Sequence, residues 1–136
     1  MKKDIQEQIN KAKSSKSLSL NDTQMTDEIW QEIVKLTHLE YLYIYRSDIG
    51  VIPDDVVLLS NLKNLTIYEC NLNNFPIALT KLATIEDLDI ADNQIANLPD
   101  DFKNLINLKD LDISGNPIRK VPEILVQLPK LNDLDL

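Results

Sequence analysis

The C-terminal part of the sequence contains three Asp-Leu-Asp triplets, and their paired carboxylates are its most evident chemistry. Paired carboxylates can act as acid and base, hold a calcium ion, or contact a basic protein surface. Because successive residues of a strand point to opposite faces, each triplet places both carboxylates on one face and its leucine on the other. The triplets contribute Asp87, Asp89, Asp110, Asp112, Asp133 and Asp135.

An open face of carboxylates favours recognition over catalysis. Acid–base catalysis needs a site that excludes water, whereas these side chains are expected on an open sheet. Calcium also takes backbone carbonyl ligands, and no loop offers them at a recognisable spacing, so calcium stays an alternative. We expect the acidic face to contact a basic protein surface; the other interpretation is a solvated face without a partner.

All four tyrosines of the chain lie upstream of these triplets. Tyr41, Tyr43 and Tyr45 alternate along one predicted strand, and Tyr68 falls at the matching position of the next. Tyrosine and arginine are common anchors of protein interfaces, and Arg46 follows the first three directly. We predict a partner-binding cluster, with cross-strand packing that only stabilises the sheet as the alternative.

The sequence predicts no enzymatic activity, no metal site and no cofactor. His38 is the only histidine and Cys70 the only cysteine, and they are expected on different sides of the predicted strands. A Ser-His-Asp or Cys-His site would have to use these residues. The sequence also has no glycine-rich phosphate loop and no Cys/His cluster at metal-ligand spacing.

A repeat organises nearly the whole chain. Residues 108–122 follow the pattern L-x-x-L-x-L-x-x-N-x-L-x-x-L-P, which is the leucine-rich-repeat signature. The first unit, which begins its strand at Leu18, is one residue longer, and the stretch Asp27–Thr37 has helical spacing. In the later units the leading apolar residue recurs every 23 residues, at Leu39, Leu62, Ile85, Leu108 and Leu131.

The asparagine of each unit is expected to hydrogen-bond buried backbone groups of neighbouring turns, because its amide both donates and accepts. Asn93 and Asn116 fill this position in the fourth and fifth units. Thr23, Ser47 and Cys70 replace it in the first three units. Since a hydroxyl or thiol offers fewer or weaker hydrogen bonds, we predict a weaker ladder on the N-terminal side, with Cys70 as a buried structural residue.

Residues 1–14 have Ile5, Ile9 and Ala12 on one helical face, and Asp4–Glu7 resembles a capping box. We predict an amphipathic helix that covers the N-terminal end of the repeat stack, because terminal repeats otherwise expose their core. A partner-binding helix is the alternative.

From Leu18 to Leu136 the chain resembles the leucine-rich-repeat superfamily, with typical or bacterial-type 23-residue repeats. The resemblance implies an α/β solenoid: a right-handed arc with a parallel concave β-sheet and short helices or 3-10 turns on the convex side. The expected organisation is a capping helix at 1–14 and a repeat domain at 15–136, with about five full repeats and a truncated sixth. The resemblance also implies recognition of another protein by the concave face.

The residues predicted to bind a partner therefore share the outward positions of the strands and the turns that follow them. They form a tyrosine-rich N-terminal half and an acidic C-terminal half of the concave face. They are Tyr41, Tyr43, Tyr45, Arg46, Tyr68, Asp87, Asp89, Asp92, Asp110 and Asp112.

The net charge of the chain restricts the kind of partner that it can bind. The formal net charge is −8, and the sequence from Ile85 onward contains eleven acidic and five basic residues. An acidic protein repels phosphate backbones, so we predict no nucleic acid and favour a partner with a basic surface. The single cysteine suits a reducing compartment, and no apolar run is long enough to cross a membrane. We expect a cytoplasmic protein that does not act on membranes; a secreted effector without a cleavable signal stays open.

The last residue, Leu136, falls on a core position of a sixth strand. We expect either that the chain is a fragment of a longer protein, that this end forms a homodimer, or that the short strand suffices as a cap. A fragment would allow an alternative function, as the substrate-targeting part of a longer bacterial enzyme or effector.

Overall fold

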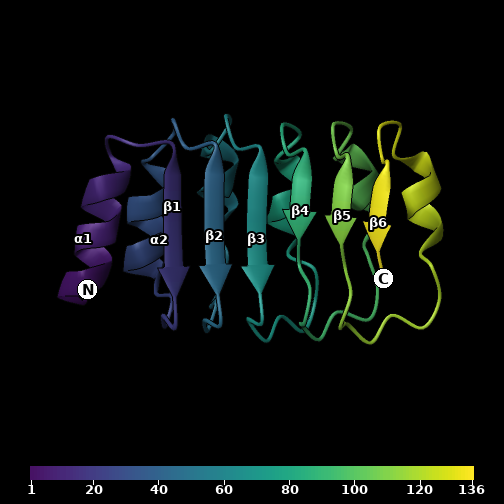
Figure 1. The fold of residues 1–136 in the computed structure, drawn as a ribbon, viewed down its shortest axis with the longest axis horizontal. Helices are drawn as coiled ribbons and strands as arrows, with labels where there is room; N and C mark the ends of the chain where they lie inside the picture. Colours follow the sequence, from purple (N-terminus) through teal and green to yellow (C-terminus); the bar gives the residue numbers. More distant parts are fainter.

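The computed structural model describes residues 1–136 and consists of one parallel sheet backed by helices (Figure 1). The strands follow one another in chain order across the sheet, so each repeat adds one strand beside the last. They are β1 (Ser17–Asn21), β2 (Tyr41–Tyr45), β3 (Asn64–Tyr68), β4 (Asp87–Asp89), β5 (Asp110–Asp112) and β6 (Asp133–Asp135). The predicted repeat solenoid is confirmed.

Each strand forms because apolar and polar residues alternate along it. In β2 the two apolar side chains, Leu42 and Ile44, are fully buried, while the three tyrosines on the other face are half-buried. The strands pair without a shift, since Leu18, Leu42 and Leu65 are successive partners in the register. The inward residues of the whole array form one hydrophobic core.

The convex side carries helices, and a proline precedes each of the short ones. Pro53, Pro76, Pro99 and Pro122 are the N-cap residues of the 3-10 helices η1 (Asp54–Leu58), η2 (Ile77–Lys81), η3 (Asp100–Asn104) and η4 (Glu123–Gln127). Proline suits this position because it lacks the N–H that would continue the hydrogen-bond ladder of the sheet, and the start of a helix does not need this N–H. The longer first unit forms α2 (Asp27–Val34), where the Thr26 hydroxyl accepts a hydrogen bond from the Ile29 amide.

The N-terminal end of the stack is covered by α1 (Lys3–Ala12), as predicted for a capping helix. Ile5, Ile9 and Ala12 are buried against the first repeat. The predicted Asp4–Glu7 capping box is wrong. The helix begins two residues earlier, with Lys2 in place of Asp4 as its N-cap, and no side chain caps it.

The hydrogen-bond ladder is weaker on its N-terminal side, as predicted. The buried Asn93 amide donates to Ile67, Ile90 and Ala91 carbonyl oxygens and accepts from two backbone amides. The Cys70 thiol makes only two long contacts, with carbonyl oxygens at 3.2 and 3.6 Å. Ser47 and Thr23 hydroxyls each donate to a carbonyl oxygen two residues earlier in the chain.

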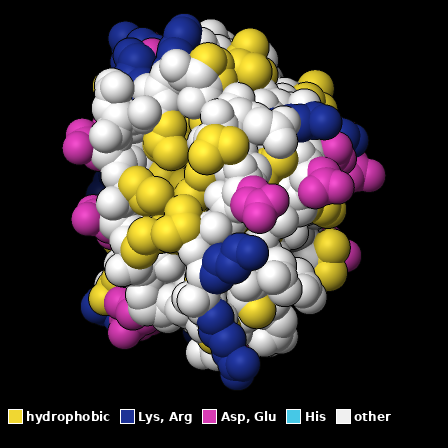
Figure 2. All heavy atoms as spheres, turned by 90° about the vertical axis from the view of Figure 1, so that its right-hand side faces the viewer, with side chains coloured by type: hydrophobic (Ala, Val, Ile, Leu, Met, Phe, Trp, Pro, Cys, Tyr) yellow, Lys and Arg dark blue, Asp and Glu magenta, His cyan; other side chains and the backbone are white.

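Apolar side chains gather on the face beyond β6 (Figure 2). Leu131 and Leu134 pack against the core but are partly exposed, and Leu136 is exposed. These are core positions of the repeat, so their exposure follows from their place at the end of the array. Dimerisation through this face stays a prediction.

Candidate functional site

The register of the sheet sorts the outward side chains into rows that run across the strands. One row contains Tyr41, Asn64, Asp87, Asp110 and Asp133, and the next contains Tyr43, Thr66, Asp89, Asp112 and Asp135. Adjacent strands lie about 4.8 Å apart, so neighbours within a row are in contact range. The structure thus brings together, on one concave face, the four tyrosines and four of the five predicted aspartates.

The four tyrosine rings form one continuous cluster. Tyr41, Tyr43 and Tyr45 stack along β2 with ring centroids 6.5 and 6.3 Å apart and interplanar angles of 19° and 12°. Tyr68 on β3 meets Tyr45 edge-on at 6.4 Å. Partial burial of the Tyr43 hydroxyl, with a smaller contribution from its tyrosine neighbours and Asp87, raises its pKa. All four rings stay half-exposed, which leaves aromatic surface for a partner.

The acidic half of the face is not paired with basic side chains. None of its six aspartates makes an ion pair. Loss of water around Asp87, followed by repulsion from neighbouring aspartates, raises its pKa. Desolvation also raises the pKa of Asp89 against the opposing effect of the Ala91 amide, and it raises that of Asp110 together with Asp133. This array of like charges disfavours the ionised form of its own members.

Two contacts join the tyrosine half to the acidic half. The Asn64 side-chain amide donates to the Asp87 carboxylate at 3.4 Å. A hydrogen bond to the Asp92 carboxylate, together with its charge, raises the pKa of the Tyr68 hydroxyl. The two halves therefore form one surface with a common boundary over β3.

A left-handed turn follows each of the first five strands, and it holds two of the predicted residues. Arg46 has φ +44° and Asp92 has φ +53°, and Asp22, Glu69 and Gly115 occupy the equivalent positions. Arg46 lies beside the cluster, but its guanidinium Nε is 3.4 Å from the Asp22 carboxylate, on the side of the first repeat. Asp92 reaches the opposite way, over Gly115, where an added Cβ would lie 1.9 Å from its Oδ1.

An alternating charge ladder borders the other edge of the face, and sequence reasoning missed it. Glu40 is 3.4 Å from Lys16 and 3.7 Å from Lys63, and Glu86 is 3.4 Å from Lys109. These residues all occupy the position just before a strand, so the repeat spacing could have predicted the ladder from the sequence. The ladder pairs these lysines with glutamates, and the charge of Lys109 also opposes the rise in the Asp110 pKa.

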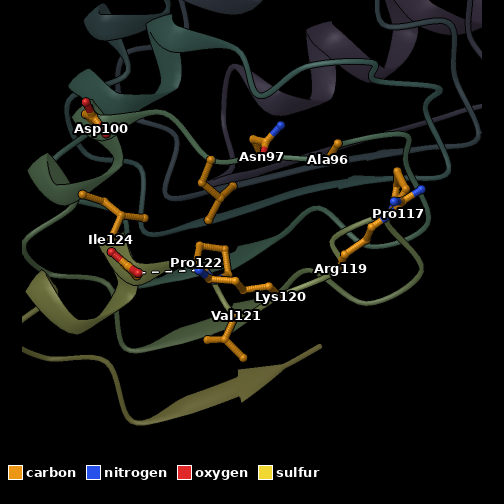
Figure 3. A pocket seen from close by; sticks show the side chains of 11 residues that line it. Ala96, Asn97, Asp100, Pro117, Arg119, Lys120, Val121, Pro122 and Ile124 are labelled. Atoms are coloured by element: carbon orange, nitrogen blue, oxygen red, sulfur yellow. Dashed lines mark ion pairs between the residues drawn. The ribbon is translucent and has the colours of Figure 1, made fainter.

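A groove of about 750 Å³ lies at the far edge of the fourth and fifth repeats (Figure 3). Leu98, Val121 and Ile124 form part of its wall, and Lys120 reaches Glu123 at 3.7 Å. Val121 occupies the position that Ile52 fills in the second repeat, where that residue is buried. Leu98 and Val121 therefore stand at a repeat-core position, and their exposure in this groove does not by itself indicate a ligand.

No three His, Cys, Asp or Glu side chains are placed so that they could hold a metal ion. Cys70 is buried, and burial raises the pKa of its thiol, as expected for a structural residue. His38 contacts the Ala12 carbonyl oxygen at 2.8 Å and thereby ties the capping helix to the second repeat. No helix combines the length and the apolar character that a membrane crossing needs.

Comparisons with known proteins agree with this geometry. Residues 83–136 match the leucine-rich-repeat family model, and no curated protein matches the sequence. Among solved structures, a leucine-rich-repeat protein of Leptospira interrogans is 29% identical with a TM-score of 0.77; the match covers 94% of this chain and 33% of that one.

Two further structures share the fold. The leucine-rich-repeat domain of the type III effector XopL is 21% identical with a TM-score of 0.67, and 96% of this chain matches 55% of that one. The ectodomain of the Arabidopsis thaliana receptor kinase GASSHO1/SCHENGEN3, solved in complex with CASPARIAN STRIP INTEGRITY FACTOR 2, is 24% identical with a TM-score of 0.73. Here 91% of this chain matches 16% of the ectodomain.

The chain thus spans a third of the length of the Leptospira protein and a smaller share of the plant ectodomain. The repeats, the parallel sheet and these matches show the leucine-rich-repeat fold, which commonly serves as a protein–protein interaction module.

Proposed function

We propose that the chain binds a partner protein through its concave face, with the tyrosine half and the acidic half contacting the same partner. The observation that carries the proposal is the composition of this face: four half-buried tyrosines in mutual contact, directly beside six aspartates without an ion pair. Large aromatic side chains are typical anchors of interfaces.

The fold itself does not require these side chains. The inward leucines and isoleucines form the core, and the outward positions need only tolerate a strand. Instead, like charges are stacked on adjacent strands, which opposes folding. Local features that weaken a fold without an evident structural gain are expected at functional sites.

The charge of the face defines the chemistry of the partner. Unpaired carboxylates attract a basic surface, speed its association and repel acidic proteins and nucleic acids. The tyrosine rings supply apolar area that the acidic half lacks. We therefore propose a basic protein segment that also presents apolar or planar groups to the rings.

A capture experiment with immobilised protein and lysate of the source organism tests the proposal. The variants are Tyr43→Ala/Tyr68→Ala and Asp89→Lys/Asp112→Lys. The matched control, Asp55→Lys/Asp101→Lys, makes the same change of charge at exposed convex positions. We expect the same captured protein to be lost with both concave variants, retained by the control and released by salt. Retention by both concave variants would refute the proposal.

A second candidate is that these repeats select the substrate of a longer bacterial enzyme or effector. Its motivation is the shared fold with the repeat domain of a type III effector. This candidate uses the same concave face, so it differs only in what is joined to the repeats. The two are separated by expressing the natural reading frame and measuring the mass of the purified product.

A further inference from the structure

At the edge of the sheet where the strands end, an irregular segment leads each repeat to its convex helix (Figure 1). Backbone hydrogen bonds join these segments between the first and second repeats, where the Met25 amide donates to the Asp48 carbonyl oxygen. They also join the third and fourth repeats, where the Gln94 amide donates to the Leu72 carbonyl oxygen. No backbone hydrogen bond joins the segments of the second and third repeats, and a groove of about 600 Å³ lies between them.

This turn groove, lined by residues within 48–54 and 70–78, exposes two apolar side chains. Val51 is 79% exposed and Ile77 is 51% exposed, although the repeat does not require an apolar residue at either position. At the position of Val51, the third, fourth and fifth repeats carry Asn74, Asn97 and Lys120. At the position of Ile77, the second, fourth and fifth repeats carry Asp54, Asp100 and Glu123.

Both exceptions to these polar columns therefore line the same groove. Its remaining apolar lining belongs to the core, since Ile52, Leu72 and Ala78 are buried. Exposed apolar side chains that gather in a polar surroundings mark interaction sites.

Polar side chains without a partner line both sides of the turn groove. On the third-repeat side stand Asn71, Asn73 and Asn74, and their amides make no hydrogen bond within the chain. An asparagine amide both donates and accepts, so it matches the N–H and C=O groups of a peptide backbone. On the second-repeat side, Asp48 and Asp54 make no ion pair, and no basic side chain lines the groove.

We propose that the turn groove docks an extended segment of a partner protein that carries an aliphatic side chain beside a lysine or arginine. The aliphatic side chain lies between Val51 and Ile77, and the cation meets the carboxylates of Asp48 and Asp54. The segment is extended because a helix bonds its own N–H and C=O groups and would leave the asparagine amides unmatched. The turn groove lies outside the concave face, so this inference does not rest on the proposed function.

Three peptides, titrated separately into the 15N-labelled protein at low ionic strength, test the chemistry of the occupant. They are acetyl-Gly-Ser-Leu-Lys-Ser-Gly-amide and its Ala-Lys and Leu-Glu counterparts. We expect the Leu-Lys peptide to shift the amide signals of Val51, Asn73 and Ile77. The dissociation constant should be about tenfold higher for the Ala-Lys peptide, because part of a leucine burial is lost. For the Leu-Glu peptide it should be about two- to fivefold higher or more, because an exposed ion pair is replaced by repulsion.

A double variant connects the binding to the turn groove. Val51→Asn/Ile77→Asp introduces residue types that other repeats carry at these positions, so the urea midpoint should stay unchanged while the peptide-induced shifts disappear. The matched control, Val126→Asn/Ile106→Asp, makes the same changes at side chains that are 87% and 52% exposed and do not line the groove. This control should bind the Leu-Lys peptide as the unmodified protein does.

Four results would overturn the inference. They are no shifts with any of the peptides, equal dissociation constants for the Leu-Lys and Ala-Lys peptides, shifts that persist in Val51→Asn/Ile77→Asp, and shifts confined to the aspartates of β4 and β5. The last result would show that the lysine alone is attracted to the acidic half of the concave face. The peptide comparison uses the unmodified protein, so it decides the question even if the double variant is destabilised.

Discussion

Asn93 is expected to be the polar side chain whose loss costs this fold most. It is 1% exposed, and its Oδ1 accepts the Cys70 and Leu72 amides at 3.0 and 3.2 Å. Neither of these two buried amides has another acceptor. Asn93→Ala leaves both without a partner, and each unsatisfied buried group costs about 1–3 kcal/mol. We therefore expect the free energy of unfolding to fall by about 2–6 kcal/mol.

Asn116→Ala is the matched control. Asn116 has the same role one repeat later, but it is partly exposed and its Oδ1 accepts only the Ile95 amide. Because one amide is lost and water can approach, we expect a loss of about 1–2 kcal/mol.

Urea unfolding followed by circular dichroism measures both losses. Fluorescence of the single tryptophan, Trp30, reports separately on the N-terminal repeats, since repeat arrays can unfold in parts. An Asn93→Ala loss below about 1 kcal/mol, or one no larger than the Asn116→Ala loss, would refute the role of the ladder.

Three further predictions concern the charged face, a turn and the thiol. Asp89 has a raised native pKa, so below about pH 3.8 its carboxyl is protonated in both the native and the unfolded state and does not destabilise the fold. The destabilising effect grows as the pH rises from there to the native pKa. Asp89→Asn should therefore stabilise the protein at pH 7 and not at pH 3, measured by urea unfolding. Gly115→Ala places a Cβ against the Asp92 carboxylate at a residue with φ +67°, so it should lower the free energy of unfolding by about 1–2 kcal/mol. Because it displaces Asp92, it should also lower the Tyr68 pKa in an ultraviolet titration. Cys70 should react with a thiol reagent at a rate that urea raises steeply, because the native thiol is buried and its pKa is raised.

Most of the fold could be predicted because the repeat fixes the register. The 23-residue step alone aligns Leu42 with Leu65 and Tyr43 with Thr66, and the structure pairs these residues. The capping helix followed from the spacing of Ile5 and Ile9. The asparagine ladder followed from the hydrogen-bonding capacity of each side chain.

The parts that escaped prediction depend on how far side chains reach. The interaction with Asp92 that raises the Tyr68 pKa joins residues on adjacent repeats, and the spacing alone does not predict that the tyrosine hydroxyl lies near this carboxylate. Arg46 is expected to lie beside the tyrosines, but its guanidinium group forms an ion pair with Asp22. Left-handed backbone at Arg46 and Glu69 also has no sequence signal, since these residue types rarely adopt it.

Site-specific photo-cross-linking tests the concave-face function most directly. A benzophenone amino acid is placed at Tyr43, at Asp112, or at the exposed convex residues Lys81 and Lys103, and the protein is irradiated with its captured partner. We predict cross-links to the same partner from both concave positions and none from the convex ones. Cross-links from the convex positions alone would contradict the proposed function and place the binding surface on the helical side.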